Sequence, residues 1–438
     1  MVKNRYMFVR VHYDKRVASL EPLGLEYLVA CVKAEKHKAF IYDESITSPF
    51  MRFKQLLDKV DRNGVTIVGF TVMSNMAWYI LELIHKLKRA RPRIKVIVGG
   101  PEVNINYRDF CVDDIDFVSY DNGLDSFRTA VRNEFDIETM KSCTGFAFRC
   151  NGEWIVNEKG APISNYGIRP DRTQFFKNKS KYRVIAKGCF SVLKTSFSCP
   201  QQCKFCISRQ FNSCTYKERP IDDVVDEIIT LKNDKIFIID DDFLLNRERV
   251  KEICEKLLRA GCKKTFMVFS RADSIVRCED IMPLIYKAGF RDFLVGLEAV
   301  EDTTLDKYNK HSSVELNKKA IAILRKYNML CVGLFVINYD FGHEDFMKIN
   351  RFIKKEGIIW VLFSILIPFK GTAVYEENKD RLYRYKYRRT DGTHVLMRPT
   401  KLPKWLFEME FRFLYYVNYP RIYWAGLTGY FNRKYKNK

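Results

Sequence analysis

Three cysteines lie within eight positions of the stretch FSCPQQCKFC, at Cys199, Cys203 and Cys206. Thiolates are soft ligands that favour zinc, copper(I) or iron–sulfur clusters. A structural zinc site closes with four ligands, often as two Cys-x-x-Cys pairs, but this stretch holds one such pair, and Cys189 or Cys214 would add a fourth thiol only at irregular spacing. Three unrelated buried cysteines are another alternative. The spacing favours a [4Fe–4S] cluster held by three thiolates, which keeps one iron open for a substrate or cofactor.

A repeating pattern of strands and helices follows the cysteines and must position them. Near-continuous apolar runs predict strands over 234–243, 265–273, 291–299, 329–337 and 358–369, and helical spacing covers 246–260 and 314–327. Such repeats fit a full or partial (β/α) barrel with its chemistry at the C-terminal strand ends. We therefore predict a partial (β/α)6 barrel domain over residues 189–380.

The first 135 residues also alternate between strands and helices. Strands are predicted over 6–13, 38–44, 65–74, 94–102 and 114–123, and helices over 24–37 and 76–91. This order predicts a Rossmann-like α/β domain with a doubly wound parallel sheet, followed by a connector over 136–188. Ligands of such sheets bind outside the carboxyl ends of the strands, which here are Thr71–Ser74, Gly99–Pro101 and Asp121–Gly123.

The cysteine stretch, with the aromatic Phe205 before its last cysteine, resembles the signature loop of the radical SAM enzymes. The segments FIIDDDF (237–243), FSRAD (269–273), GLEAVEDTTLDKYNK (296–310) and ILIPFKGTAVYEE (365–377) are similar to that family's second, third, fourth and sixth strands. The resemblance covers roughly 190–380. It implies that the three cysteines ligate a [4Fe–4S] cluster, at which S-adenosylmethionine (SAM) is reductively cleaved. The resulting 5′-deoxyadenosyl radical would abstract hydrogen from an unactivated carbon.

The resemblance also implies where SAM binds. Asp240 and Asp241 would lie near its amino or sulfonium end, and Arg271 and Glu298 near its carboxylate and ribose. The full set of implied SAM contacts is Phe205, Asp240, Asp241, Arg271, Glu298 and Pro368. The implied partners are a small-molecule or natural-product substrate, a class that includes lipids and peptides, and an electron donor such as flavodoxin or ferredoxin.

The N-terminal stretches EPLGLEYLVACVKAEKHKAFIYDE, VGFTVMS and VIVGGPE resemble the cobalamin-binding domain fused to many of these enzymes. The implied cobalamin contacts are Leu23, Gly24, Thr71, Met73, Ser74, Gly99, Gly100, Pro101, Asn122 and Gly123. The paired resemblance implies a cobalamin-dependent C-methyltransferase that transfers the methyl group of methylcobalamin. The alternative is a non-methylating rearrangement, cyclisation or oxidation, with cobalamin absent or in another role.

Four features depart from these family patterns, among them YDNGLDS (120–126) in place of Gly-Glu-Gly-Glu and FVINYDFG (335–342), which lacks the usual glycine turn. No Asp-x-His-x-x-Gly stretch offers a histidine to cobalt, and His12 and His37 are the histidines nearest the first two predicted strands. Ser198 stands where glycine commonly precedes the first cysteine.

Composition limits the class of protein. Thirteen cysteines, mostly isolated, suit reduced thiols in a cytoplasmic protein better than a disulfide framework. The charged N-terminus has no apolar core of a secretory signal, and no apolar run is long enough to predict a spanning helix. The net charge is +22, which also allows a nucleic-acid-binding protein with a zinc knuckle, although the combined motifs argue against nucleic acid.

Half of the excess charge lies in the C-terminal segment 381–438, which holds 14 Lys and Arg against 3 Asp and Glu. We predict a helix over 403–417 that is broken before Pro420. Its aromatic residues suit either a helix that closes the open side of the barrel or an amphipathic helix that meets a lipid surface. In the second case the headgroups would face Arg433, Lys434, Lys436 and Lys438.

Overall fold

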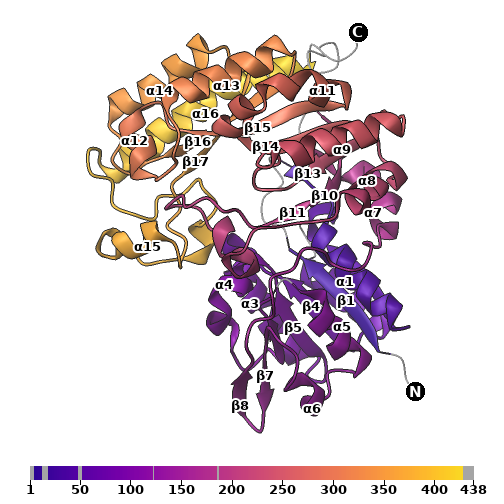
Figure 1. Cartoon of the computed structure of the whole chain (residues 1–438). Helices are drawn as coiled ribbons and strands as arrows, with labels where there is room; N and C mark the ends of the chain where they lie inside the picture. The colour runs from indigo at the N-terminus through magenta and orange to yellow at the C-terminus, as the bar shows by residue number, and fades with distance from the viewer. Residues whose placement is uncertain (1–3, 12–17, 48–51, 122, 185–186, 428–438) are drawn as a thin grey trace. The chain divides into compact units, whose positions relative to one another are not determined.

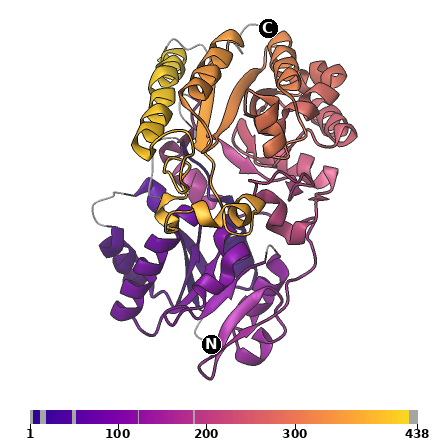
Figure 2. The same cartoon turned by 90° about the vertical axis from the view of Figure 1, so that its left-hand side faces the viewer.

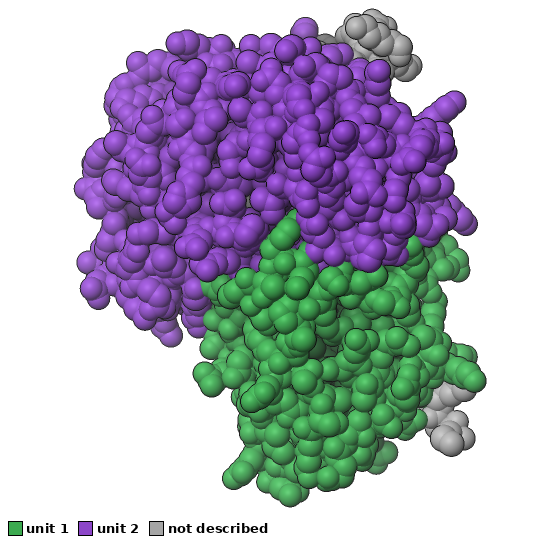
Figure 3. Space-filling view, viewed as in Figure 1, with its two compact units in different colours: residues 1–184, 210–217 green, residues 185–209, 218–438 purple. Residues whose placement is uncertain are grey.

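The computed structural model describes residues 4–11, 18–47, 52–121, 123–184 and 187–427. The chain forms two compact units, Met1–Val184 with Gln210–Lys217, and Ile185–Arg209 with Glu218–Lys438 (Figure 3). Asn122, His12 and the four basic residues beyond position 432, for which the sequence predicted roles or sites, lie outside the described residues.

In the described part of the first unit, seven strands form one sheet in the order β3-β1-β4-β5-β6-β7-β8. These strands are β1 (Arg5–Arg10), β3 (Lys38–Asp43), β4 (Ile67–Thr71), β5 (Lys95–Gly99), β6 (Phe117–Ser119), β7 (Phe146–Cys150) and β8 (Glu153–Val156). The first five run parallel, and their order reverses between β1 and β4. The predicted doubly wound sheet is therefore confirmed, and its switch point lies at the ends of β1 and β4.

Helices cover both faces of this sheet. α1 and α5 lie side by side and share a core with β1, whereas α3 and α4 lie on the other face (Figure 1). The helices of the unit are α1 (Leu23–Ala34), α2 (Arg52–Asn63), α3 (Ala77–Ala90), α4 (Pro101–Asn106), α5 (Leu124–Arg132), α6 (Ile137–Met140) and α7 (Thr173–Lys177). Because both faces are covered, a central strand such as β4 is buried over its first four residues.

The predicted connector 136–188 mostly belongs to this first unit. The hairpin β7–β8 extends the sheet, because Phe148 pairs antiparallel with Phe117 of β6. Further along, β9 (Arg183–Val184) pairs with β2 (Ala18–Ser19).

In the second unit, six parallel strands of the described residues form the order β10-β13-β14-β15-β16-β17, with helices on the outer side (Figure 1). The strands are β10 (Ser191–Leu193), β13 (Lys235–Ile238), β14 (Thr265–Arg271), β15 (Phe290–Glu298), β16 (Leu330–Ile337) and β17 (Trp360–Ile365). This is the predicted partial (β/α)6 barrel. Chain order and sheet order agree, as expected of successive right-handed β-α-β units.

The helices of the second unit alternate with its strands. They are α8 (Ile221–Thr230), α9 (Arg247–Arg259), α10 (Ala272–Arg277), α11 (Met282–Lys287), α12 (Asp302–Lys307), α13 (Val314–Lys326), α14 (His343–Lys355), α15 (Ala373–Glu377) and α16 (Lys404–Leu427). Side-chain caps fix where some of them begin. Asn246 accepts a hydrogen bond from the Arg249 N–H at α9, and Ser313 accepts one from the Leu316 N–H at α13.

Helix α16 is longer than predicted. The prediction that the helix breaks before Pro420 is wrong, since the helix continues to Leu427. A proline removes one backbone donor, but packing of one helix face against neighbouring elements can hold the helix through it. Here α16 lies beside α14 and β17 (Figure 2), and Asn418 donates hydrogen bonds to Asn350 Oδ1 at 2.9 Å and to the Leu414 carbonyl at 2.8 Å. Within the described ranges, no helix combines the length and hydropathy needed to cross a membrane.

Candidate functional site

The cysteine loop begins after β11 (Ser196–Phe197) in the second unit. Ser198 Oγ donates to the carbonyl oxygens of Ser208 at 3.3 Å and Arg209 at 3.2 Å, and so ties the two ends of the loop together. Ser198 has φ 63°, in the left-handed region that glycine adopts most easily. A glycine would adopt this conformation at no steric cost, and the two hydrogen bonds hold serine in it.

The loop is held from the side by residues about a hundred positions later in the chain. The Lys204 N–H donates to the Tyr308 carbonyl at 3.0 Å, and Asn309 Nδ2 donates to the Gln202 carbonyl at 2.9 Å. The ring of Phe205 meets that of Tyr308 edge to face, with centroids 5.2 Å apart. Phe205 therefore acts as an anchor of the loop in this structure.

The three thiols are half-buried. Burial raises the pKa of the Cys199 thiol to about 12 and also raises that of Cys206, with Asp241 adding to both shifts. Arg271 Nη1 donates to Cys203 Sγ at 3.7 Å, which places a cationic group beside this sulfur. Among the described residues, no three His, Cys, Asp or Glu side chains converge as ligands of a single ion. A cubane binds each thiolate at a different iron, so it requires no such convergence, and three thiols on one short loop are a donor set that fits it.

Asp240 and Asp242 are buried and hold the backbone. Asp240 Oδ1 accepts from the N–H groups of Thr195 at 2.6 Å and Ser196 at 3.1 Å, and its other oxygen accepts from the Thr195 hydroxyl. Asp242 accepts from the hydroxyls of Ser270 at 3.1 Å and Ser274 at 2.6 Å. Both carboxylates are thus engaged within the fold, and Asp240 fixes the strand that leads into the cysteine loop.

Asp241 differs from both neighbours. It is half-buried, and no hydrogen bond or ion pair of its carboxylate occurs among the described residues. Its charge acts on Cys199 and Cys206, so it lies close to the thiols. Of the two acids that the resemblance assigned to SAM, Asp241 is the one whose carboxylate is available.

This contrast predicts different consequences for two neighbouring substitutions. Asp240→Ala should lower the free energy of unfolding by about 3 kcal/mol, because two buried N–H groups lose their acceptor. Asp241→Asn should change stability by less than about 0.5 kcal/mol but weaken SAM binding roughly tenfold, because it would remove the charge-assisted hydrogen bond to SAM that the resemblance implies. Urea unfolding and equilibrium dialysis with SAM measure the two effects. Equal stability losses in the two variants would contradict the assignment.

A buried charge network lies behind the loop. Arg271, 5% exposed, donates through Nη2 to the Lys310 carbonyl at 2.6 Å and through Nε to Asp273 at 2.8 Å. Lys310 Nζ lies 2.8 Å from Glu298 Oε1, and both side chains are nearly inaccessible. Burial lowers the pKa of Lys310, but the charges of Glu298 and Cys203 outweigh burial and raise it.

Lys310 was not predicted as a site residue, although the segment GLEAVEDTTLDKYNK (296–310) ends on it. A lysine in a polar turn carries no sequence signal of burial, and its partner lies twelve positions earlier. Glu298 has φ 61°, a rare conformation for a residue other than glycine, which places its carboxylate toward the lysine. Arg271 and Glu298 therefore lie in one network with Cys203. Pro368, also predicted as a SAM contact, is buried just after β17.

The predicted cobalamin residues of the first unit gather at the carboxyl edge of its sheet. The Val72 N–H donates to the Gly99 carbonyl at 2.8 Å, which joins the ends of β4 and β5. Ser74 Oγ donates to the buried Glu102, and Met73 is 52% exposed beside them. The remaining described members lie at the same edge or at the start of the following helix: Leu23, Gly24, Thr71, Gly100, Pro101 and Gly123.

This edge has open space at one glycine and, among the described residues, no histidine to serve as a metal ligand. Gly24 has open space where a Cβ would stand, and Met73 offers an exposed apolar side chain. Of the described histidines near the sheet, His37 precedes β3 and His85 lies on α3, so neither stands at the carboxyl edge.

Gly100 makes this edge sensitive to substitution. Its φ of 101° and ψ of −179° lie in a region open almost only to glycine, and a Cβ there would meet the backbone N of Val72 at 2.8 Å. Gly100→Ala should therefore lower the free energy of unfolding by about 3 kcal/mol and reduce cobalamin uptake. Gly152→Ala is the matched control, because Gly152 also has positive φ but nothing within 4 Å of its Cβ position. Urea unfolding and cobalamin absorbance measure both, and equal losses would show that the close approach is unimportant.

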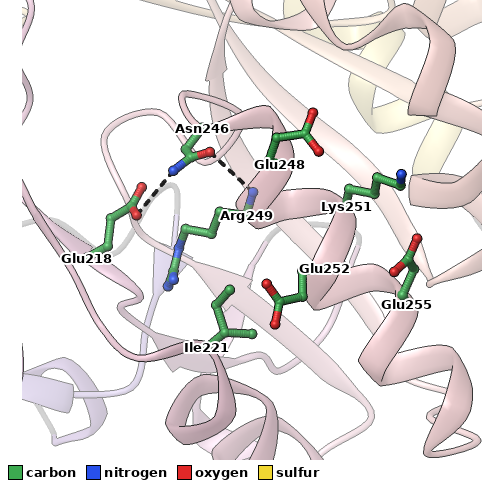
Figure 4. A pocket seen from close by; sticks show the side chains of 8 residues that line it. All are labelled: Glu218, Ile221, Asn246, Glu248, Arg249, Lys251, Glu252 and Glu255. Carbon is green, nitrogen blue, oxygen red and sulfur yellow. Dashed lines mark hydrogen bonds between the residues drawn. The ribbon is translucent and has the colours of Figure 1, made fainter.

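A separate hollow of about 450 Å³ lies between α8 and α9 (Figure 4). It is lined by Glu218, Ile221, Asn246, Glu248, Arg249, Lys251, Glu252 and Glu255. Asn246 donates to Glu218 at 3.3 Å, and Arg249 Nη2 donates to the Thr195 carbonyl at 3.2 Å. Because these polar groups support the helix start and the strand before the cysteines, we assign no ligand to this hollow.

Comparisons with known families agree with this geometry. Residues 10–131 match the family model described as the B12 binding domain, and residues 193–353 match that of the Radical SAM superfamily. The chain is a radical SAM enzyme with a B12-binding domain. The first match contains all the predicted cobalamin residues, and the second contains the cysteine loop and Asp241.

Solved structures of other radical SAM enzymes share the fold. TsrM from Kitasatospora setae, with cobalamin and a [4Fe-4S] cluster bound, matches with a TM-score of 0.68 and 16% identity over 86% of this chain and 78% of its own. OxsB, with aqua-cobalamin and S-adenosylmethionine bound, matches with a TM-score of 0.67 and 15% identity over 86% of this chain. The match covers 55% of the length of OxsB, so that enzyme has much additional chain.

Curated relatives of this radical SAM enzyme include named methylases and cyclases. The hopanoid C-3 methylase of Methylococcus capsulatus is 24% identical over 89% of this chain and 75% of its own length. The anaerobic magnesium-protoporphyrin IX monomethyl ester cyclase of Rubrivivax gelatinosus is 23% identical over 91% of this chain and 74% of its own. The cofactors implied by the family are therefore SAM, a [4Fe–4S] cluster and cobalamin.

Proposed function

We propose that this radical SAM enzyme is a cobalamin-dependent C-methyltransferase that acts on an unactivated carbon of a small molecule or natural product. One observation carries the proposal: a B12-binding domain and a radical SAM domain occur on one chain that aligns over most of its length with a methylase. Cofactors perform the difficult chemistry in such enzymes, and the protein binds and orients them. When bound, the cluster supplies the electron that cleaves SAM, and cobalamin supplies the methyl group.

The residues of the second unit would divide the remaining work. Cys199, Cys203 and Cys206 would ligate iron, and Asp241 would accept a hydrogen bond from the amino group of SAM. Asp240 would hold the strand that leads into the loop. Arg271 places a buried positive charge against Cys203, which offsets the negative charge of ligating thiolates and sulfide.

A partial reaction tests methyl transfer without knowledge of the substrate. The full chain is reconstituted anaerobically with iron, sulfide and cobalamin, and reduced in the presence of SAM that carries a deuterated methyl group. We expect cluster absorbance, about one cobalamin per chain, and deuterated methyl on cobalamin. If 5′-deoxyadenosine forms but no label reaches cobalamin, a non-methylating rearrangement, cyclisation or oxidation replaces methylation.

Metal analysis of the same preparation tests the remaining alternative. Zinc without iron or sulfide would favour a nucleic-acid-binding knuckle.

For the reducing partner we propose a flavodoxin or ferredoxin, and replacement of the chemical reductant by either protein with its reductase should sustain turnover.

A further inference from the structure

Helix α16 exposes an apolar stripe on its outer face. Among the described side chains of the helix, the exposed large apolar ones are Trp405 (66%), Met409 (53%), Phe413 (47%), Tyr416 (80%), Tyr419 (37%) and Trp424 (71%). The first five recur every three or four residues and therefore share one side of the helix. Exposed large apolar residues that gather in this way mark an interaction site, whereas scattered ones need no explanation.

The fold does not account for this stripe, because the opposite face of α16 already packs inside the second unit. Phe407, Phe411, Leu414 and Asn418 are at most 3% exposed, and they pack toward α14 and β17. The helix therefore has two apolar faces, and only one of them is covered within the described residues.

The composition of the outer face fits a lipid–water interface. Part of the stripe borders a shallow hollow of about 720 Å³, whose lining residues are Arg412, Tyr415, Tyr416, Tyr419, Pro420 and Trp424. Trp and Tyr have an apolar body and a polar tip, and they are enriched where the hydrocarbon of a bilayer meets its headgroups. Arginine on such a helix extends its charge toward the headgroups while its stem covers apolar surface.

Charge distinguishes a lipid surface from a second copy of the chain. Residues 381–438 hold 14 basic and 3 acidic residues, and four of the basic ones follow α16 in sequence. Two such segments would repel each other across a symmetric interface, whereas anionic headgroups attract them. The same excess of charge disfavours a basic protein partner.

We propose that α16 docks the enzyme peripherally on anionic lipid bilayers, with the stripe Trp405–Trp424 lying in the headgroup region. This inference goes beyond the proposed methyl transfer and does not depend on it. Docking would place the second unit beside lipid-dissolved molecules.

Vesicle sedimentation of the full reconstituted chain tests the proposal. With vesicles of equal parts phosphatidylglycerol and phosphatidylcholine, we expect the wild type to bind, and Trp405→Ser/Tyr416→Ser to bind roughly tenfold more weakly. Ile229→Ser/Leu258→Ser is the matched control, because these apolar side chains are also exposed in the second unit but lie on α8 and α9. Equal binding by the two double variants, or no binding by the wild type at low salt, would overturn the proposal.

Two further measurements complete the test. Phosphatidylcholine alone should bind the wild type several-fold more weakly, and equal binding to both vesicle types would remove the role of charge. Sedimentation equilibrium without lipid should give a monomer. A dimer that Trp405→Ser/Tyr416→Ser dissociates would assign the stripe to a second copy instead. Retained SAM cleavage shows that each variant is folded.

Discussion

Cys203→Ser should abolish cluster assembly and SAM cleavage, with at least a hundredfold loss of 5′-deoxyadenosine formation. A cubane held by three protein thiolates has no spare ligand, and a serine hydroxyl is a poor ligand for iron in a sulfur-rich site. The loop should still form, because its backbone contacts with Tyr308 and Asn309 do not involve the thiol. Iron and sulfide analysis, absorbance, and quantitation of 5′-deoxyadenosine measure the effect.

Cys214→Ser is the matched control for this substitution. Cys214 lies eight residues beyond Cys206 in the chain and is more exposed than the three half-buried loop cysteines, so its thiol is accessible but its spacing does not fit the motif. It should retain iron, sulfide and SAM cleavage. If Cys214→Ser lost metal as Cys203→Ser does, the site would have four thiol ligands, and the zinc alternative would return.

Lys310→Met should lower the free energy of unfolding of the second unit by about 3–5 kcal/mol. Lys310 Nζ lies 2.8 Å from Glu298 Oε1, and both side chains are largely shielded from water. The substitution therefore leaves Glu298 buried and without its cationic partner. Removal of one member of a buried pair is costly because the remaining charge keeps its desolvation penalty. The double variant Lys310→Met/Glu298→Gln should recover most of the loss, because it removes both charges.

Urea unfolding followed by limited proteolysis of the second unit measures these differences. The same variants separate structure from SAM binding. If Glu298 contacts SAM, the double variant should be stable yet bind SAM more weakly than the wild type. If Glu298 serves only the fold, the double variant should bind SAM normally. A Lys310→Met protein as stable as the double variant would contradict the buried pair.

Local sequence was sufficient to predict the class of site and the order of elements. Cys199, Cys203 and Cys206 all lie in one loop, so their spacing alone identifies the site and no distant residue is needed. Buried parallel strands such as β4 and β15 contain short apolar runs, and their alternation with amphipathic helices predicts a parallel sheet. The strands and helices of both sheets are predicted from apolar patterns that each span fewer than about twenty residues.

Tertiary structure decided what each polar residue does. Three adjacent acids look alike in sequence, but Asp240 is occupied by the backbone after β10 and Asp242 by hydroxyls of β14 and α10, which leaves Asp241 available. The role of Lys310 likewise depends on Glu298 in the preceding strand. α16 continues through Pro420 because α14 and β17 pack against it. Helix propensity, which depends on local sequence alone, does not include this packing. In each case the deciding partner lies on another element, and folding alone brings the two into contact.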